Sequence, residues 1–381
     1  MSKRHFWGFA ALQVSYWCFH ASFICYASAF FLDHGIGNTT VSLLLAGYML
    51  CSFLGSIVWG AVCDAIGSNK KVFLLGVFVS AALMYIIYTF VSSAGVMAIA
   101  YPLLGFFFLP QSANSEAWLL SACNHDQKTY GLIRSTPSFV YALWAMLMGR
   151  LIDAHGYAVM LAGGTAFVLV VVIAALLLPD AVRNVRRQGK QPGVKALREV
   201  LDNKPFRRLI VLLFFAGLAA APINNMKIVV LQNVGGSVRH VGMDSFVSAM
   251  MQVPFFMLSG SLQRIPLRIR YAVMTLGPLL LILMCLFAVS PAMVLIGSAM
   301  YNIGYGITIP TMREVTERCV QPERRTLGHT LSDAVFTSLS GVISLTYAGF
   351  IVDGFGVHAM LAVCGVISVI PFVMNIFHAK D

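Results

Sequence analysis

The sequence predicts an all-α membrane protein with twelve transmembrane helices in two pseudo-symmetric six-helix halves. Three observations support this fold class: the composition, a series of long apolar segments and an internal repeat. Of 381 residues, 59% are hydrophobic and only 11% are charged, whereas soluble chains carry roughly 25% charged residues. A chain of this composition is suited to a lipid environment.

The apolar segments are long enough to cross a bilayer, which takes about 20 residues of helix. The first of them follows the start of the chain without a small-residue cleavage site, so we interpret it as a retained span and not as a signal peptide. The twelve expected spans are residues 6–32, 39–62, 71–92, 95–120, 130–152, 157–179, 207–232, 242–262, 271–289, 292–313, 327–350 and 357–377.

The basic residues gather on one side of this arrangement. With the N-terminus in the cytoplasm, 22 of the 26 Lys and Arg residues fall in cytoplasmic segments, as the positive-inside rule requires. We therefore expect a multi-pass protein of the cytoplasmic (inner) membrane with both termini in the cytoplasm. The net charge of +11 then needs no nucleic-acid partner. The expected partners are the lipid bilayer and a small-molecule substrate, and the chain is expected to be a monomer.

The spacing of the cysteines and the absence of a nucleotide-binding motif argue against other classes of protein. None of the eight cysteines forms a CxxC pair, and most lie inside apolar segments, so we expect neither a disulfide framework nor a metal site. The sequence contains no GxxxxGK[ST] motif, which argues against ATP-driven transport. We expect no enzyme activity and no cofactor, with a proton gradient as the energy source.

A long basic segment divides the expected spans six and six. We predict an N-terminal half at residues 1–180, a basic cytoplasmic linker at 181–206 and a C-terminal half at 207–381. The halves repeat, since GRLIDAHG at 149–156 recurs as GFIVDGFG at 349–356. Paired halves of this kind are typical of transporters that bind substrate near the middle of the bilayer and alternate its access to the two sides.

The segment between the second and third spans carries the pattern GxxxDxxGxxK, formed by Gly60, Asp64, Gly67 and Lys70. This pattern resembles the signature of the major facilitator superfamily, which implies a role in conformational gating. Gly60 is expected to allow a close helix approach, and Gly67 to permit a left-handed turn. Asp64 can accept hydrogen bonds from a helix N-terminus or a basic side chain. The alternative is a plain cytoplasmic turn with solvated side chains.

Few ionisable side chains lie inside the expected spans, where such groups are expensive and usually face a cavity or a partner. They are His20, Glu116, Arg134, Lys227 and Asp333. Glu116 and Arg134 lie at similar distances from the loop between the fourth and fifth spans, so their side chains can meet. We expect them either to neutralise each other or to clamp a hydroxylated or charged substrate, with Arg134 as a hydrogen-bond donor.

Around this pair the sequence resembles the lactose permease group of oligosaccharide:proton symporters. The shared pattern is Glu-Ala-Trp at 116–118, followed by Gly131, Arg134 and Tyr141 at the spacing of that group. There the Glu and Arg bind sugar hydroxyls and an aromatic residue stacks on the sugar ring, which implies these roles for Glu116, Arg134 and Tyr141. The second half departs from the group, because its tenth span lacks the charged residues that the group uses for coupling.

Other polar side chains complete the predicted substrate site. His20 follows an aromatic stretch at residues 16–19, and Asn224, Asn225 and Gln252 occupy the seventh and eighth spans. We interpret all four as candidate substrate ligands, with a packed polar residue as the alternative for His20.

Proton coupling needs a group that binds and releases a proton near neutral pH. Asp333 is the best candidate because it lies in an otherwise apolar span, where we expect its carboxyl to be partly desolvated. His329 on the same helix face is a candidate relay, and Glu314 is a weaker alternative beside Arg313 and Arg318. The opposing interpretation is that Asp333 and His329 only cap or solvate the end of the eleventh span.

Together these patterns predict a secondary active transporter that moves a sugar or oligosaccharide-like molecule by proton symport with alternating access. Three alternatives remain open: an efflux transporter of drugs or metabolites, a nucleoside or aromatic-acid:proton symporter, and a non-transporting membrane receptor.

Overall fold

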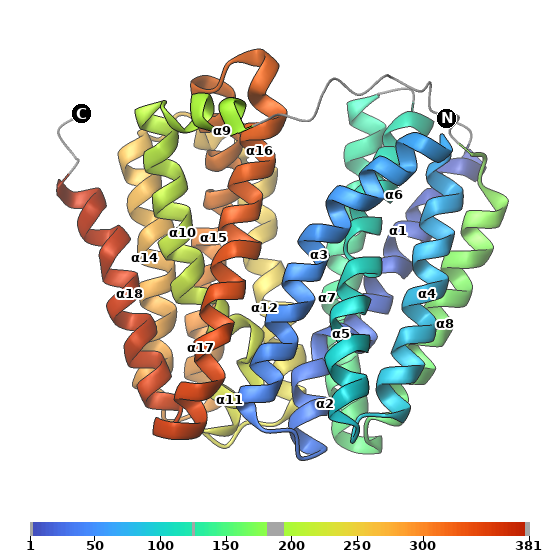
Figure 1. Cartoon of the computed structure of the whole chain (residues 1–381), viewed down its shortest axis with the longest axis horizontal. Helices are drawn as coiled ribbons and strands as arrows, with labels where there is room; N and C mark the ends of the chain where they lie inside the picture. The colour runs from blue at the N-terminus through green and yellow to red at the C-terminus, as the bar shows by residue number, and fades with distance from the viewer. Residues whose placement is uncertain (1–2, 124–125, 181–193, 378–381) are drawn as a thin grey trace. The chain divides into compact units, whose positions relative to one another are not determined.

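The computed structural model describes residues 3–123, 126–180 and 194–377, and within these ranges the regular elements are all helical (Figure 1). Contacts divide the chain into two compact units. Unit 1 comprises Met1–Arg187 and Ser237–Phe246, and unit 2 comprises Gln188–Gly236 and Val247–Asp381. The predicted all-α fold class is confirmed.

The helices of unit 1 correspond to the first six expected spans. In the described ranges they are α1 (Lys3–Phe23), η1 (Ile24–Tyr26), α2 (Ala27–Asp33), α3 (Asn38–Ile66), α4 (Asn69–Thr89), α5 (Ala94–Phe108), α6 (Pro110–Ala122), α7 (Gln127–His155) and α8 (Ala158–Leu177). The 3-10 turn η1 interrupts the first span, which comprises α1 and α2, and the fourth span comprises α5 and α6.

The fourth span breaks at Pro110, which has no N–H to bond the carbonyl oxygen of Phe106 one turn earlier. That carbonyl instead accepts the indole N–H of Trp59 from α3 at 3.0 Å. The neighbouring carbonyl of Phe108 accepts the hydroxyl of Tyr16 from α1 at 2.6 Å. Because a membrane offers no water to such groups, a broken helix needs partners of this kind. The break therefore ties α1 and α3 to the fourth span.

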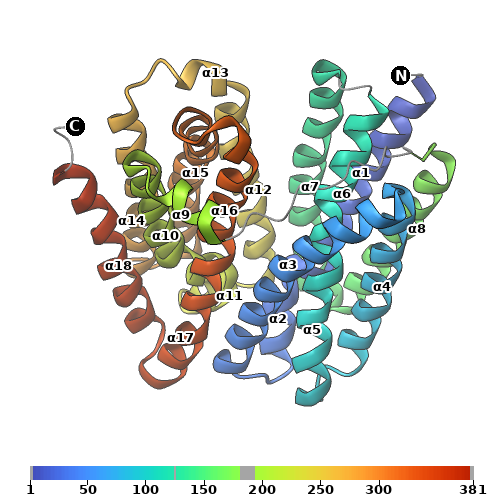
Figure 2. The ribbon, with the colours of Figure 1, turned by 45° about the horizontal axis from the view of Figure 1, so that its top comes forward.

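The remaining elements correspond to the expected linker and to the last six spans. They are α9 (Val194–Leu201), α10 (Lys204–Asn225), α11 (Lys227–Gln232), α12 (Val238–Met257), α13 (Ser259–Leu262), α14 (Leu267–Leu286), α15 (Pro291–Cys319), η2 (Pro322–Arg324), α16 (Arg325–Asp333), the π-helix η3 (Ala334–Leu339), α17 (Ser340–Phe355) and α18 (Val357–Phe377). The short α13 follows α12 as a separate turn (Figure 2).

The predicted linker at 181–206 is partly helical, which the sequence analysis did not anticipate. Its residues 181–193 lie outside the described ranges, but α9 forms at its end and lies beside α16 (Figure 1). Val200 of α9 is 4% exposed in the apolar core of unit 2, and Glu199 pairs with Arg324 at 2.9 Å. Asn203 caps α10 by accepting from the Phe206 N–H at 3.0 Å. These contacts hold α9 against unit 2.

Nine helical segments of the described chain are long and apolar enough to cross a membrane. The first, fifth and eighth expected spans are not among the nine, because they carry polar side chains such as Gln13 in α1, Arg134 in α7 and Asp244 in α12. These three spans pack among the apolar ones and complete a twelve-span arrangement.

Close helix approaches occur at glycines other than the one expected. A Cβ added at Gly105 of α5 would clash with the carbonyl oxygen of Tyr48 in α3 and lie 2.8 Å from Ser52 Oγ. Small residues commonly permit such approaches in membranes. At Gly60, by contrast, no atom lies within 4 Å of an added Cβ, so the expectation of a close approach there is wrong. Gly67 has a φ of 69°, which confirms the left-handed turn.

The contact between α3 and α5 can be tested at Gly105. We expect Gly105→Ala to lower the melting temperature of the purified protein in detergent, because overpacking of a tight interface costs about 1–3 kcal/mol. Gly95→Ala in the same helix is the matched control, since an added Cβ there has no neighbour within 4 Å and alanine favours helix by up to about 1 kcal/mol. Equal melting temperatures would contradict the tight approach.

Candidate functional site

Glu116 and Arg134 form the predicted ion pair in unit 1. Arg134 Nε lies 2.7 Å from Glu116 Oε1, and the two side chains remain 38% and 28% exposed. They come from α6 and α7, which are adjacent antiparallel helices (Figure 2). The Tyr130 hydroxyl, one turn before Arg134, is within hydrogen-bonding distance of both. The pair therefore keeps donors and acceptors available to a ligand. Its role in binding stays a prediction.

An aromatic cluster lies two helical turns beyond Arg134 on α7. Tyr141 packs edge-on against Trp17 of α1 with centroids 6.4 Å apart and lies 5.9 Å from the His20 ring. The Tyr141 hydroxyl points at Cys25 Sγ, 3.9 Å away. His20 and Tyr141, both predicted from the sequence, are thus neighbours. Trp17 was not singled out, although it lies in the aromatic stretch before His20.

Unit 2 contains a network of four uncharged polar side chains and one lysine. Gln252 of α12 donates a hydrogen bond to Asn302 Oδ1 of α15. Asn302 Nδ2 donates to Ser248 Oγ at 2.8 Å and to the Ser298 carbonyl at 2.7 Å. The buried Lys227 at the start of α11 donates to Ser298 Oγ at 2.7 Å. The network connects α11, α12 and α15.

Of this network, the sequence predicts only Gln252 as a substrate ligand, and it marks Lys227 only as an ionisable residue inside a span. A signal for the others was present: Ser248 and Gln252 are four residues apart on one helix, and Ser298 and Asn302 four apart on another, so each pair shares a face. Among the hydrogen bonds that the structure describes, none connects the two predicted asparagines, Asn224 and Asn225, to this network. Asn225 Nδ2 bonds the Ala221 carbonyl of its own helix at 2.8 Å, and Asn224 bonds Tyr301.

Glu314 lies in a buried charge cluster at the end of α15. Arg270 of α14 binds it through two nitrogens, at 2.6 and 3.2 Å, and Arg318 binds it at 2.8 Å. Arg270 is 2% and Glu314 8% exposed. Because two guanidinium groups hold this carboxylate, the geometry favours a structural ion cluster over the weaker alternative of proton coupling.

Asp333 and His329 do not form the relay that the sequence suggested. Asp333 pairs with Arg313 of α15 at 2.8 Å, and both side chains are 45% exposed, so the carboxyl is only partly removed from solvent. His329 Nε2 lies 2.8 Å from Glu317 Oε1, although it is four residues from Asp333. The reason is that α15 places an arginine and a glutamate opposite these two residues. Their roles in coupling stay predictions.

The motif between α3 and α4 is anchored to the end of α8. Lys70 Nζ donates to the carbonyls of Leu176 and Leu178 at 3.1 and 2.7 Å, and Ser68 Oγ donates to Asp180 at 2.5 Å. A cation at a helix C-terminus is favourable because that end carries partial negative charge. The side chain of Asp64 lies outside what the structure describes. The gating role of Gly60, Asp64, Gly67 and Lys70 stays a prediction.

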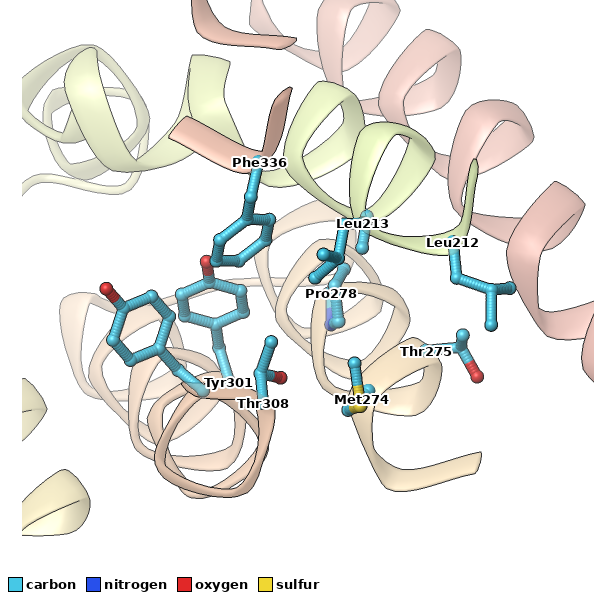
Figure 3. Close-up of a pocket in the computed structure, with 10 residues that line it drawn as sticks. Leu212, Leu213, Met274, Thr275, Pro278, Tyr301, Thr308 and Phe336 are labelled. Carbon is cyan, nitrogen blue, oxygen red and sulfur yellow. The ribbon is translucent and has the colours of Figure 1, made fainter. Parts of the chain in front are cut away.

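A small cavity inside unit 2 is lined by α10, α14, α15 and η3. Its walls are mostly apolar, with Leu213, Met274, Pro278 and Phe336 facing it (Figure 3). The space, about 10 Å³, is close to the minimum for one water molecule. It is too small for a substrate, and we interpret it as a packing defect beside the π-helix.

In the part of the chain that the structure describes, no group of three or more His, Cys, Asp or Glu side chains is arranged to hold a metal ion. The polar network of unit 2 and the ion pair of unit 1 remain the candidate ligands for an organic substrate.

Comparisons with known proteins agree with this architecture. The sequence profile described as Major Facilitator Superfamily matches residues 12–334. No curated protein matches the chain. Among solved structures, the nucleoside transporter NupG aligns with a TM-score of 0.83 at 13% identity, covering 99% of both chains, and a mutant of NupG aligns with 0.84 at 12% identity, covering 98% of this chain and 99% of that one. A bacterial homologue of the human lysosomal transporter Spinster aligns with 0.70 at 13% identity, covering 98% and 96%.

The charge cluster at the end of α15 predicts a difference between two arginines. Arg270→Met is expected to lower the unfolding free energy by about 3 kcal/mol or more, because it leaves the buried Glu314 without its main partner. Arg313→Met removes an exposed pair and is expected to cost less than about 1 kcal/mol. Thermal unfolding in detergent compares the two, and equal losses would show that burial does not distinguish these pairs.

Proposed function

The chain belongs to the Major Facilitator Superfamily, and we propose that within this transporter family it carries a polar small molecule of the sugar or oligosaccharide type by proton symport. It is a multi-pass membrane transporter and not an enzyme. The proposed mechanism is alternating access, in which two six-helix halves expose a central site to each side of the membrane in turn.

The observation that carries the proposal is the partly exposed ion pair of Glu116 and Arg134. Charged groups within membrane spans are costly unless they face water or a partner. A pair that served only to neutralise two charges would be expected to be enclosed, yet these side chains remain 28% and 38% exposed. An arginine fork next to a carboxylate offers donors and acceptors together, which suits vicinal hydroxyl groups.

The chemistry of unit 2 supports a neutral polar substrate. Gln252 and Asn302 carry carboxamides, and Ser248 a hydroxyl, so each can both donate and accept. We propose Gln252, Asn224 and Asn225 as substrate ligands in unit 2, and Glu116, Arg134, Tyr141 and His20 as substrate ligands in unit 1. A substrate rich in hydroxyl groups matches this set better than an ion does.

A nucleoside is the second candidate substrate. NupG, whose fold this chain shares over 99% of both chains, is described as a nucleoside transporter. Specific support comes from the aromatic cluster of Trp17, His20 and Tyr141, because aromatic side chains stack on flat bases. The ribose hydroxyls would then occupy the ion pair. Sugars and nucleosides share the requirement for hydroxyl recognition.

We propose that the protein resides in the cytoplasmic membrane as a monomer with both termini inside. The positive-inside rule supports this orientation, because it places 22 of the 26 Lys and Arg residues in cytoplasmic segments. In this orientation the helix ends next to Lys70 and the short helix α9 lie on the cytoplasmic side. The energy source is then the proton gradient, with no bound cofactor.

For coupling we propose Asp333, with His329 and Glu314 as alternatives. Asp333 pairs with Arg313 in an exposed setting, so a proton can replace the arginine as its partner without leaving a buried charge unpaired. Glu314 is enclosed by Arg270 and Arg318, and His329 is bonded to Glu317. Asp333 is therefore the acid whose partner can change most readily.

The clamp is tested by Glu116→Gln and Arg134→Ala. Both variants are expected to lose substrate binding at least about 10-fold, because charge-assisted hydrogen bonds are about twice as strong as neutral ones. Binding is measured by titration of labelled sugars and nucleosides against the purified protein in detergent. Arg324→Ala is the matched control: it breaks a pair with similar exposure, 35% and 43%, at the end of unit 2, and should bind as wild type does.

A charge swap separates the two interpretations of the same pair. The double variant Glu116→Arg with Arg134→Glu preserves mutual neutralisation but exchanges the positions of donor and acceptor. If the pair is only structural, the swap restores wild-type binding. If it is a clamp, the swapped protein folds but does not bind.

Coupling is tested by Asp333→Asn, which imitates a permanently protonated carboxyl. The variant is expected to bind substrate and exchange it across the membrane, yet fail to accumulate it against a gradient. Counterflow and pH-driven uptake in proteoliposomes measure the two activities. Unchanged accumulation would exclude Asp333 as the coupling acid, and loss of exchange would assign it to binding or to folding.

A further inference from the structure

The first helix presents one partly exposed face, and that face carries Trp17 and His20. From Phe9 to Phe31, every side chain is buried or only partly exposed. Positions 14, 17, 20 and 24 are among the partly exposed ones, and their spacing places them on one side of the helix. Helix α8, by contrast, leaves Leu169, Ile173 and Leu176 more than half exposed, as expected of a surface that meets lipid. The face of α1 is different, because it carries an imidazole and an indole.

The three rings of this cluster fix one another. Trp17 and His20 lie three residues apart with centroids separated by 5.7 Å, and the indole meets the Tyr141 ring at an interplanar angle of 89°. His20 also packs against the fully buried Phe108 at 5.7 Å. Edge-to-face contacts of this kind orient aromatic rings. The indole is therefore held in one orientation before any ligand binds.

Within the described part of the chain, His20 Nδ1 is buried without a hydrogen bond. For Trp17 the structure records only ring contacts, and its side chain is partly exposed. Buried polar groups are normally bonded, and each exception needs an explanation. An unbonded imidazole nitrogen beside a partly exposed indole indicates that something other than the protein contacts this face.

Three other tryptophans of unit 1 donate their indole N–H to an oxygen atom of the protein. Trp59 donates its N–H to the Phe106 carbonyl at 3.0 Å, and Trp118 to the Pro179 carbonyl at 3.0 Å. Trp144 donates to Ser22 Oγ at 2.8 Å. Trp17 lies in the same unit, but among the hydrogen bonds that the structure describes there is none from its indole N–H.

We propose that Trp17 is the platform that stacks on a ring of the substrate, and that His20 Nδ1 bonds a polar atom at the edge of that ring. This rests on the proposed transport of a hydroxylated molecule. Tyr141, which the sequence suggested as the platform, then orients the indole.

The separation of this platform from the ion pair sets the shape of the substrate. Tyr141 lies seven residues after Arg134 on the same face of α7, which is roughly 10 Å along the helix. A ring on Trp17 and a separate hydroxylated group on Glu116 and Arg134 describe a molecule with two linked parts. Disaccharides and nucleosides both have this form, since each joins a ring to a second ring that bears hydroxyls.

The experiment uses the full-length protein in proteoliposomes with two labelled probes, uridine and a β-galactoside disaccharide. Trp17→Ala is expected to weaken binding of the transported probe roughly 10- to 100-fold, as loss of an aromatic stacking partner does. Trp17→Phe, which keeps an aromatic ring of smaller area, should lie between wild type and Trp17→Ala. His20→Ala should weaken binding about 10-fold. Trp144→Phe is the matched control, since it removes a structural indole, and should retain wild-type affinity.

Fluorescence provides a readout that a merely structural role would not change. Substrate that stacks on Trp17 should quench part of the intrinsic tryptophan emission, and this quenching should vanish in Trp17→Phe but persist in Trp144→Phe. Wild-type affinity and quenching in both Trp17 variants would overturn the proposal while leaving the transport function intact. If wild type transports neither probe, the proposed function fails and the platform with it. Selective binding of one probe, lost in Trp17→Ala, supports the platform and identifies the class of ring.

Discussion

Polar groups inside a bilayer have to find partners within the protein, and much of this structure follows from that constraint. A carbonyl freed by Pro110 accepts Trp59 from another helix, and Lys227 donates to Ser298 across a helix boundary. Each unmet group would cost several kcal/mol in hydrocarbon. The partners come from helices far apart in sequence, so satisfying them also determines which helices are neighbours. Glycines such as Gly105 then let the backbones approach closely enough for these bonds to form.

The two units meet this constraint with different chemistry. Unit 1 places a partly exposed ion pair and an aromatic face within one bundle, whereas the inner polar network of unit 2 contains carboxamides, hydroxyls and one lysine. Its charge cluster lies instead at the end of α15, where Arg270 and Glu314 are nearly enclosed. The partly exposed ion pair of unit 1 and the inner polar network of unit 2 thus differ in chemistry.

The spans and the pair of Glu116 and Arg134 could be predicted because both depend on local pattern. Apolar length determines a span, and equal distances from one short loop bring two side chains together. The position of Trp17 against Tyr141 could not be predicted, since it depends on how α1 packs beside α7. The failure at Gly60 has the same origin: a glycine motif shows where an approach is permitted, while packing decides where it occurs. For Asp333, the sequence showed an apolar helix but not that α15 would present Arg313 to it.

The difference between Asp333 and Glu314 bears on how a proton could drive the cycle. Protonating Glu314 would leave the enclosed Arg270 without its carboxylate, and breaking a buried pair costs about 3–5 kcal/mol. The exposed pair of Asp333 and Arg313 contributes at most about 1 kcal/mol. A coupling group has to exchange its partner in every turnover, so its pair must be weak enough for a proton to compete. On this criterion the pair of Asp333 and Arg313 supports the proposal of Asp333 as the coupling acid, whereas the enclosed pair of Arg270 and Glu314 fits a structural role at the end of α15.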